Sequence, residues 1–278
     1  MCDICVMNAV KDRMLSRRSL FKGAAMAGAA AALAGATGTA ASAASHGGKT
    51  ASLDAPADMT HAIHPDFPTY FGDPQYSEEQ LFHFDKNGFN LKQFTVNEHT
   101  GTHIDAPLHF SADGHSVDEI PIAQLVAPLC VIDIKARAAE DADAQVTPDD
   151  IKAWMSANGD IPANACIAMN SGWDAKMGTD GFRNFDGTAM HFPGFHVETV
   201  KMLMEETPAT SIAVDTLSLD YGPSPDFAAH YAWLPSGRFG IECIANLDMM
   251  PAAGATLIIG APKHKGGTGG PARLIGLA

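Results

Sequence analysis

The sequence lacks the short motifs by which several large enzyme classes are recognised. It contains no GxGxxG or Walker run for a nucleotide phosphate and no GxSxG run for a serine nucleophile. It has no internal repeat, and after residue 50 nothing approaches the ~20 continuous apolar residues of a membrane-spanning helix. These absences argue against common nucleotide-binding and serine-hydrolase folds, repeat architectures and a membrane-bound mature form.

Positive charge is also scarce. The chain of 278 residues has 18 lysines and arginines against 32 aspartates and glutamates, a formal net charge of −14. Such a surface repels the phosphate backbone, so we expect no nucleic-acid partner. A small-molecule substrate is compatible with this charge.

Cysteines are too few and too irregularly placed for a disulfide framework. Cys2 and Cys5 form a C-x-x-C pair close to the start of the chain, whereas Cys130, Cys166 and Cys243 each lie in an apolar context. Three cysteines on buried strands are typical of free, packed thiols. We therefore predict no disulfide among these three.

The first 43 residues have the pattern of a twin-arginine export signal. Ser16-Arg17-Arg18-Ser19-Leu20-Phe21-Lys22 precedes an apolar Ala/Gly-rich run, and Ala41-Ser42-Ala43 fits an A-x-A cleavage site. This pattern predicts a periplasmic or exported protein without Cys2 and Cys5; an uncleaved membrane anchor is the alternative. We predict a signal peptide over 1–43, a flexible mature terminus over 44–56 and one domain over 57–278.

Apolar runs alternate with helical patterns through that domain. Thr147-Pro148 followed by acidic residues predicts a helix start, and Asn87-Gly88 is a hairpin signal between two strands within 80–98. Strands alternating with helices after an early antiparallel pair predict a single α/β domain with a mixed sheet and flanking helices. The expected strands are 129–134, 165–169, 211–215, 255–260 and 273–277, and the expected helices begin at residues 148 and 196.

The stretch HTGTHIDAPLHF concentrates three histidines and one carboxylate. His99, His103, Asp105 and His109 share one parity, so an extended chain would direct all four into one cavity. Gly and Pro within the stretch disfavour a helix, and we expect a strand that leads into a loop. Imidazole and carboxylate groups suit Zn, Mn or Fe, and a fourth ionisable group beside three ligands is typical of a catalytic metal site.

A second pair of candidate residues lies in the last quarter of the chain. His230 and Glu242 stand on either side of an expected loop over 231–240, and Glu242 lies in an apolar run. An unpaired carboxylate there would be costly, so Glu242 requires a metal ion or a hydrogen-bonded partner. A salt bridge to Arg238 is the alternative.

Several other side chains are candidates for a substrate pocket. An early Pro-rich segment, a strand-end loop and a glycine- and aromatic-rich loop over 178–195 carry most of them. A surface arm, a core tryptophan and a strand-end turn are the structural alternatives. The candidates are Phe67, Tyr70, Trp173, His191, Phe192 and Ser218.

The metal stretch closely resembles the signature H-x-G-T-H-x-D-x-P-x-H of the metal-dependent cyclase family, which includes bacterial kynurenine formamidases and isatin hydrolases. The resemblance extends over roughly 57–278 and implies a swivelling β/β/α fold, a homo-oligomer, and one or two Zn or Mn ions. It also implies the site roles: His99, His103 and Asp105 as metal ligands, His109 as acid/base, and His230 with Glu242 completing the site or holding a second ion.

The two branches of that family remain open at this point. Glu242 favours a formamidase-type site, whereas the run HFPGF at 191–195 is similar to isatin hydrolases. We predict a metal-dependent hydrolase that cleaves a C–N amide bond of a small, aromatic, linear or cyclic amide. The alternatives are a periplasmic metal- or ligand-binding protein without turnover and a metal-dependent lyase or dehydratase.

Overall fold

The computed structural model describes residues 56–278. The predicted signal peptide over 1–43 and all but the last residue of the predicted flexible segment lie outside the described residues. Within 56–278, no helix is both long and apolar enough to cross a bilayer.

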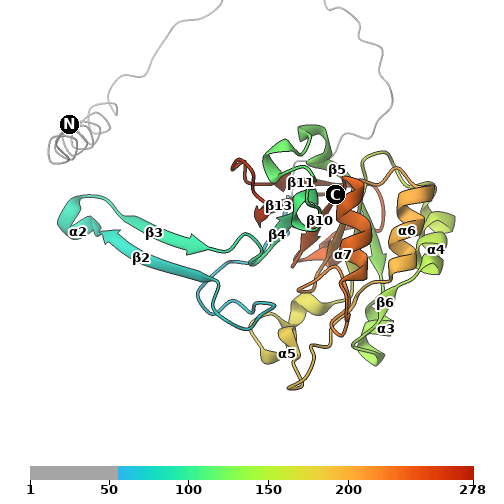
Figure 1. The fold of residues 1–278 in the computed structure, drawn as a ribbon, viewed down its shortest axis with the longest axis horizontal. Helices are drawn as coiled ribbons and strands as arrows, with labels where there is room; N and C mark the ends of the chain where they lie inside the picture. The colour runs from blue at the N-terminus through green and yellow to red at the C-terminus, as the bar shows by residue number, and fades with distance from the viewer. Residues whose placement is uncertain (1–55) are drawn as a thin grey trace, which may run out of the picture. The chain divides into compact units, whose positions relative to one another are not determined.

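A nine-stranded mixed sheet organises the domain (Figure 1). Its central strands β5, β7, β9 and β10 run parallel, and antiparallel strands flank them on both sides. All five predicted strands are present, which confirms the α/β class. In spatial order the strands are β1 (Ala57–Asp58), β13 (Arg273–Leu277), β11 (Ala255–Gly260), β5 (Val126–Asp133), β7 (Cys166–Asn170), β9 (Ser211–Val214), β10 (Phe239–Glu242), β4 (His103–Asp105) and β12 (Gly269–Pro271).

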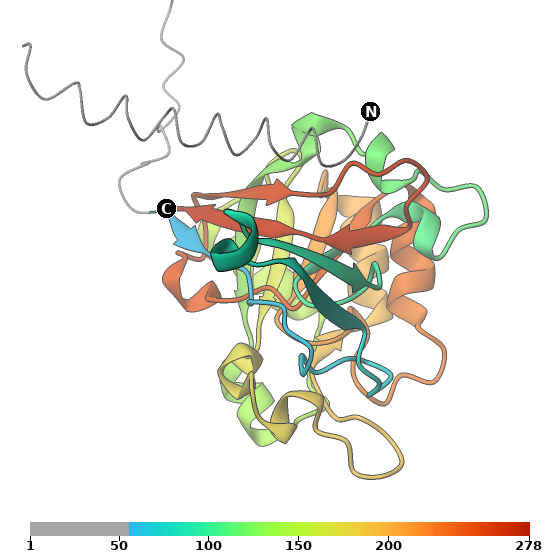
Figure 2. The same ribbon diagram turned by 90° about the vertical axis from the view of Figure 1, so that its left-hand side faces the viewer.

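The sheet curls so that its two ends approach each other. Strand β12 stands at one end of the strand order and β13 is next to last at the other, yet only Ala272 separates them in sequence. Figure 2 shows the C-terminal strands, in red, side by side. Ile104, Leu257 and Leu274 from different parts of the sheet are fully buried in one apolar cluster inside the curl. Burial of this apolar surface stabilises the curled form.

Helices cover the other face of the central strands (Figure 1). Ile151, Val200 and Trp233, one from each of three helices, are fully buried in a second apolar cluster with strand residues. The two predicted helices are confirmed, and Thr147 begins the first with a capping box, as its sequence indicates. The helices are α3 (Lys135–Glu140), α4 (Pro148–Asn158), α5 (Asp180–Arg183), α6 (Val197–Glu206) and α7 (Ala228–Trp233); a small sheet pairs β6 (Gln145–Val146) with β8 (Gly194–Phe195).

The predicted hairpin forms a separate two-stranded sheet of β2 (Tyr76–Phe82) and β3 (Leu91–Val96). Its connection differs from the expected tight turn. Residues Phe84–Asn87 form the short helix α2, and Gly88 ends that helix with a left-handed φ of 80°. Residues 80–93 belong to a different compact unit from residues 56–79 and 94–278.

The three cysteines of the described chain are free and buried, as predicted. Cys130 and Cys166 lie on the neighbouring strands β5 and β7. Burial raises the pKa of each of these two thiols to about 12. Neither is reactive near neutral pH, because the thiolate is the nucleophilic form.

Candidate metal centre and adjoining cavity

The metal stretch is less extended than its sequence predicts. Only His103–Asp105 forms a strand, β4; residues 99–102 form a turn with Gly101 at a φ of 72°, and Pro107–His109 forms a 3-10 turn. The alternation of a strand therefore explains why His103 and Asp105 share a face, but turns bring the other two histidines there.

Strand pairing adds the glutamate to this face. Strand β10 runs antiparallel to β4, with Glu242 directly opposite His103 and Gly240 opposite Asp105. A Cβ on Gly240 would lie 3.3 Å from Asp105 Oδ2 and 2.6 Å from Leu219 Cδ1, so a larger residue here would crowd the carboxylate and displace the leucine side chain. Arg238, the alternative partner of Glu242, instead donates to the carbonyl oxygens of Met204 and Ala209.

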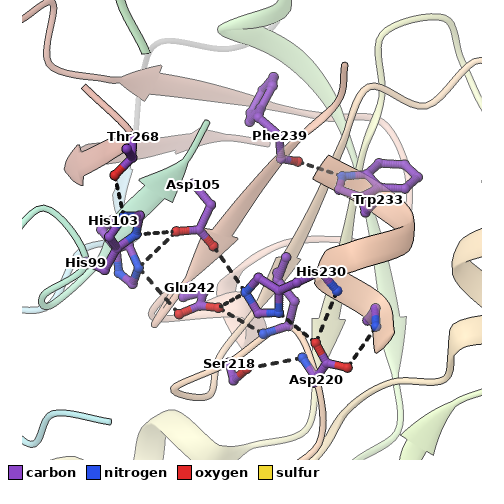
Figure 3. A network of polar contacts seen from close by, with 12 residues as sticks. His99, His103, Asp105, Ser218, Asp220, His230, Trp233, Phe239, Glu242 and Thr268 are labelled. Atoms are coloured by element: carbon purple, nitrogen blue, oxygen red, sulfur yellow. Dashed lines mark hydrogen bonds and ion pairs between the residues drawn. The ribbon is translucent and has the colours of Figure 1, made fainter. Parts of the chain in front are cut away.

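His230 lies on helix α7 rather than at the edge of the loop expected over 231–240. Asp220, which is buried, accepts hydrogen bonds from the backbone N–H groups of Ala229 and His230 at the start of this helix. The same carboxylate lies 2.6 Å from His230 Nδ1 (Figure 3). The proton on Nδ1 is thereby fixed, and Nε2 is free to act as a ligand.

Five side chains form two overlapping groups that could hold metal ions, since within each group one ligand atom per residue lies within 4.8 Å of the others. One consists of His99, His103 and Asp105, and the other of Asp105, His230 and Glu242. Nε2 of His103 lies 3.2 Å from Asp105 Oδ1 and 3.4 Å from Glu242 Oε2, while Nε2 of His230 lies 3.1 Å from Glu242 Oε1 (Figure 3). Asp105 belongs to both groups and would therefore contribute a ligand to an ion held by either.

The electrostatics of the two groups fit a cation. His103 Nε2 and Asp105 Oδ2 are buried and have no hydrogen-bond partner, which is costly unless an ion satisfies them. Burial alone would lower the pKa of His103, but the carboxylates of Asp105 and Glu242 raise it to about 9. Likewise burial opposes ionisation of Asp105, yet His103 holds the pKa of Asp105 well below its usual value. The site thus favours positive charge between its carboxylates, which a divalent metal supplies.

His109 belongs to neither ligand group. Its ring stacks on that of His99 with centroids 3.7 Å apart, and it lines the adjoining cavity. Burial lowers the pKa of His109 to about 4, against the attraction of Asp105. The imidazole is therefore neutral at pH 7 and can accept a proton, as a general base does.

A cavity of about 660 Å³ opens onto both ligand groups. Its apolar wall is aromatic: the ring of Phe227 lies 5.7 Å from those of Tyr70 and Phe110, and the ring of Phe110 lies 4.7 Å from that of His230. Ser218 contributes a hydroxyl group to the lining. The size and the aromatic wall suit a small, flat ligand.

The structure brings together some of the predicted pocket residues and not others. Tyr70 and Ser218 line the cavity. Phe67, Trp173 and Phe192 are instead buried in an apolar cluster that also contains Leu217 and Cys243 of the cavity lining. These three aromatic side chains therefore support the cavity wall from behind.

His191 is also outside the cavity lining. Its Nδ1 lies 2.9 Å from Asp143, and its Nε2 lies 3.3 Å from Asp186, at a partly exposed position. His191, like Phe67, Trp173 and Phe192, therefore does not line this cavity.

Four functional candidates were missed in the sequence. Phe110 ends the metal stretch itself, so its position was visible but its role was not. Phe227 adopts a left-handed backbone conformation (φ 52°), which is rare for a bulky residue. This conformation is visible only in the structure, so the sequence gives no signal for Phe227. Asp220 and Thr268 act through hydrogen bonds to His230 and His99, respectively. The spacing of these residues in the sequence does not predict either contact.

Asp215, at the end of β9, anchors the loop that carries Trp173. It accepts hydrogen bonds from the hydroxyl and N–H of Ser171 and from the N–H of Trp173. Burial raises the pKa of Asp215 to about 7. Between the ordinary value of 3.8 and about 7 the native protein therefore holds a proton that the unfolded chain releases.

This proton makes Asp215 a source of pH-dependent stability. Since the unfolded state binds fewer protons in that window, stability is expected to fall as pH rises through it, by up to about 1.4 kcal/mol per unit. Asp215→Asn, which cannot ionise, is expected to lose this component of the slope. Urea unfolding of both proteins at several pH values checks it; identical slopes would contradict the prediction.

Comparison with known proteins identifies relatives over most of the described chain. Residues 57–221 match the Cyclase family model. An isatin hydrolase of Roseibium aggregatum is 33% identical over 225 residues, which cover 77% of this chain and 84% of that protein. A kynurenine formamidase of Salinibacter ruber is 25% identical over 225 residues, which cover 78% of this chain and 95% of that protein.

A solved structure agrees with these relatives. Isatin hydrolase A from Labrenzia aggregata, bound to benzyl benzoate, superposes with a TM-score of 0.76 at 35% sequence identity. The match covers 81% of this chain and 93% of that chain.

Proposed function

Because the chain belongs to the cyclase family, we propose that it is a metal-dependent hydrolase that opens the C–N amide bond of a small aromatic cyclic amide of the isatin type. The observation that carries this proposal is the pair of ligand groups sharing Asp105 at the floor of an aromatic cavity. His109, beside the ligands but outside both groups, provides a proton acceptor at the same place.

The ligand set supports a divalent ion. Imidazole and carboxylate ligands suit Zn or Mn, and the two groups provide places for one ion each. His99, His103 and Asp105 would hold the first ion, and Asp105, His230 and Glu242 the second. When bound, such an ion polarises a carbonyl oxygen and makes water nucleophilic near neutral pH.

The protein's own residues supply orientation and proton transfer. Phe110 and Phe227 hold the aromatic ring of the substrate against the cavity wall and exclude water from that side. Neutral His109 accepts a proton as water attacks the carbonyl carbon. His109 then returns that proton to the amide nitrogen as the C–N bond breaks.

The charge of the cavity favours an uncharged substrate. No lysine or arginine is present among the described residues that line it, whereas Glu98 and Glu242 both are. A free amino acid such as N-formylkynurenine carries a carboxylate that would find no lysine or arginine side chain to pair with there. The absence of lysine and arginine from the lining supports a substrate of the isatin type, although Glu242 favours a formamidase-type site.

The first test measures metal and turnover on one sample of the purified full chain. Elemental analysis is expected to find one or two metal ions per chain, and isatin is expected to be hydrolysed faster than N-formylkynurenine. Removal of metal with a chelator should abolish turnover, and re-addition of Zn or Mn should restore it.

Other outcomes of this test distinguish the alternatives. Bound metal without turnover of either compound would favour a binding protein. Product that does not incorporate oxygen from ¹⁸O-labelled water would favour a lyase or dehydratase. Absence of metal after reconstitution would overturn the proposal.

We also propose that the protein is exported through the twin-arginine route and forms a homo-oligomer. The Arg17-Arg18 pair supports export, and cell fractionation of an Arg17→Lys, Arg18→Lys variant tests it.

Exposed apolar residues within 80–93 support self-association: Leu81, Phe84 and Leu91 are 41%, 54% and 45% exposed. Light scattering that reports a monomer would contradict the oligomer.

A further inference from the structure

A chain of hydrogen bonds connects His99 to an exposed loop. Nε2 of His99 lies 2.9 Å from the hydroxyl oxygen of Thr268 (Figure 3). The Thr268 hydroxyl donates to Glu98 over 2.5 Å, and His264 Nε2 lies 2.6 Å from the same carboxylate. The backbone N–H of Thr268 also points to Glu98, so this threonine is held from two sides.

The direction of these bonds determines which nitrogen of His99 carries a proton. A carboxylate only accepts hydrogen bonds, and a hydroxyl group has a single hydrogen to donate. The Thr268 hydrogen goes to Glu98, so its oxygen is left as an acceptor toward His99. Nε2 of His99 must then be the donor, and it carries the proton.

The other nitrogen of His99 faces the ligand groups. Nδ1 lies 2.7 Å from Asp105 Oδ1. A nitrogen lone pair and a carboxylate oxygen at this distance repel each other unless a cation, either a proton or a metal ion, lies between them.

The other two histidines have the opposite arrangement. Nδ1 of His103 lies 2.8 Å from the carbonyl oxygen of Gly101, and Nδ1 of His230 lies 2.6 Å from Asp220. A carbonyl oxygen accepts only, so Nδ1 of His103 is a donor, and Asp220 has the same effect on His230. In both rings Nε2 is the nitrogen that faces the carboxylates.

We propose that His99 binds the metal through Nδ1, whereas His103 and His230 bind through Nε2, and that Thr268, held by Glu98, is the positioning residue that imposes this difference. The inference rests on the metal site of the proposed function. It assigns a role to Thr268 and Glu98, which lie outside both ligand groups.

The glycine-rich run over 263–270 is built around this chain of hydrogen bonds. A Cβ on Gly269 would lie 2.7 Å from His99 Cε1 and 2.3 Å from the Ile104 carbonyl oxygen. A Cβ on Gly267 would lie 2.1 Å from His264 Nε2. Glycine at these two positions therefore leaves space for the ring of His99 and for the contact between His264 and Glu98.

Nuclear magnetic resonance of the zinc-loaded full chain with ¹⁵N-labelled histidine tests the assignment. Long-range ¹H–¹⁵N correlations identify Nε2, because it couples to both ring C–H protons. The expected spectrum shows a proton on Nε2 of His99 and on Nδ1 of His103 and His230; a His99→Gln spectrum identifies the His99 signals. A proton on Nδ1 of all three rings would overturn the inference.

The same experiment separates this inference from the proposed function. If the protein takes up neither zinc nor manganese, the proposed function fails, and the metal-free spectrum still reports whether Nε2 of His99 is protonated. If zinc binds but His99 ligates through Nε2, the inference alone fails.

Variants of Thr268 test its positioning role by metal affinity. Thr268→Val removes the acceptor for His99 and is expected to weaken zinc binding by about 10–100-fold. Thr268→Ser keeps the hydroxyl and is expected to restore affinity. Competition with a chromophoric chelator measures both.

A matched control separates positioning from general destabilisation. Thr199 is fully buried on α6, and its hydroxyl donates to the Val146 carbonyl oxygen. Thr199→Val is expected to lower the melting temperature without changing zinc affinity. Equal losses of affinity in Thr199→Val and Thr268→Val, or no loss in Thr268→Val, would overturn the role of Thr268.

Discussion

Asp105→Asn is expected to remove bound metal from both ligand groups and to lower turnover by at least about 10³-fold. Asp105 is the one residue shared by the two groups, and its carboxylate is fully buried between His99, His103 and His230. An amide cannot supply the negative charge that offsets a divalent ion. Elemental analysis and a steady-state assay of the purified variant measure both effects.

Glu242→Gln is the matched comparison for Asp105→Asn. It changes a carboxylate of similar burial that belongs to the second group alone, so the first group is expected to keep its metal. If two ions are bound, the content per chain falls from two to one. Retention of full metal content in Asp105→Asn would contradict the shared-ligand arrangement.

His109→Ala is expected to keep the metal and to lose about 10²–10⁴-fold in kcat, the usual contribution of a positioned acid/base. The ring lies beside the ligands and has a pKa lowered to about 4, yet it belongs to neither ligand group. Its loss removes proton transfer without removing a metal ligand. Elemental analysis alongside kcat distinguishes the two roles.

His115→Ala provides the control for His109→Ala. His115 is in the same part of the chain but has a side chain 71% exposed, and it does not line the cavity. Its replacement is expected to leave kcat unchanged. A fall in metal content in His109→Ala would instead identify His109 as a ligand.

Elements with a strong local pattern were predictable without the fold. The capping box at Thr147 and the apolar runs of β5, β7 and β9 appear where the sequence indicates. The spacing of His103 and Asp105 also places both side chains on one face of a strand. In each case the determining interactions join residues a few positions apart.

Aromatic residues were harder to place. Tyr70 lines the cavity, whereas Phe192 is buried behind it, although both occur in similar Gly- and Pro-rich surroundings. Trp173, which follows Gly172, is buried behind the cavity as well. Burial of an aromatic side chain is favourable in free energy both against a substrate and within the core. Local sequence therefore does not distinguish the two environments.

The completed site depended on contacts between distant segments. Antiparallel pairing of β10 with β4 sets Glu242 opposite His103. Asp220 orients His230 at the start of helix α7, which extends into the loop expected over 231–240. Thr268 reaches His99 because β12 pairs with the other edge of β4. The types of the ligand residues could be identified from local sequence. Their mutual geometry and the positions of their protons required the tertiary structure, because the register between distant strands follows from the packing of the whole sheet.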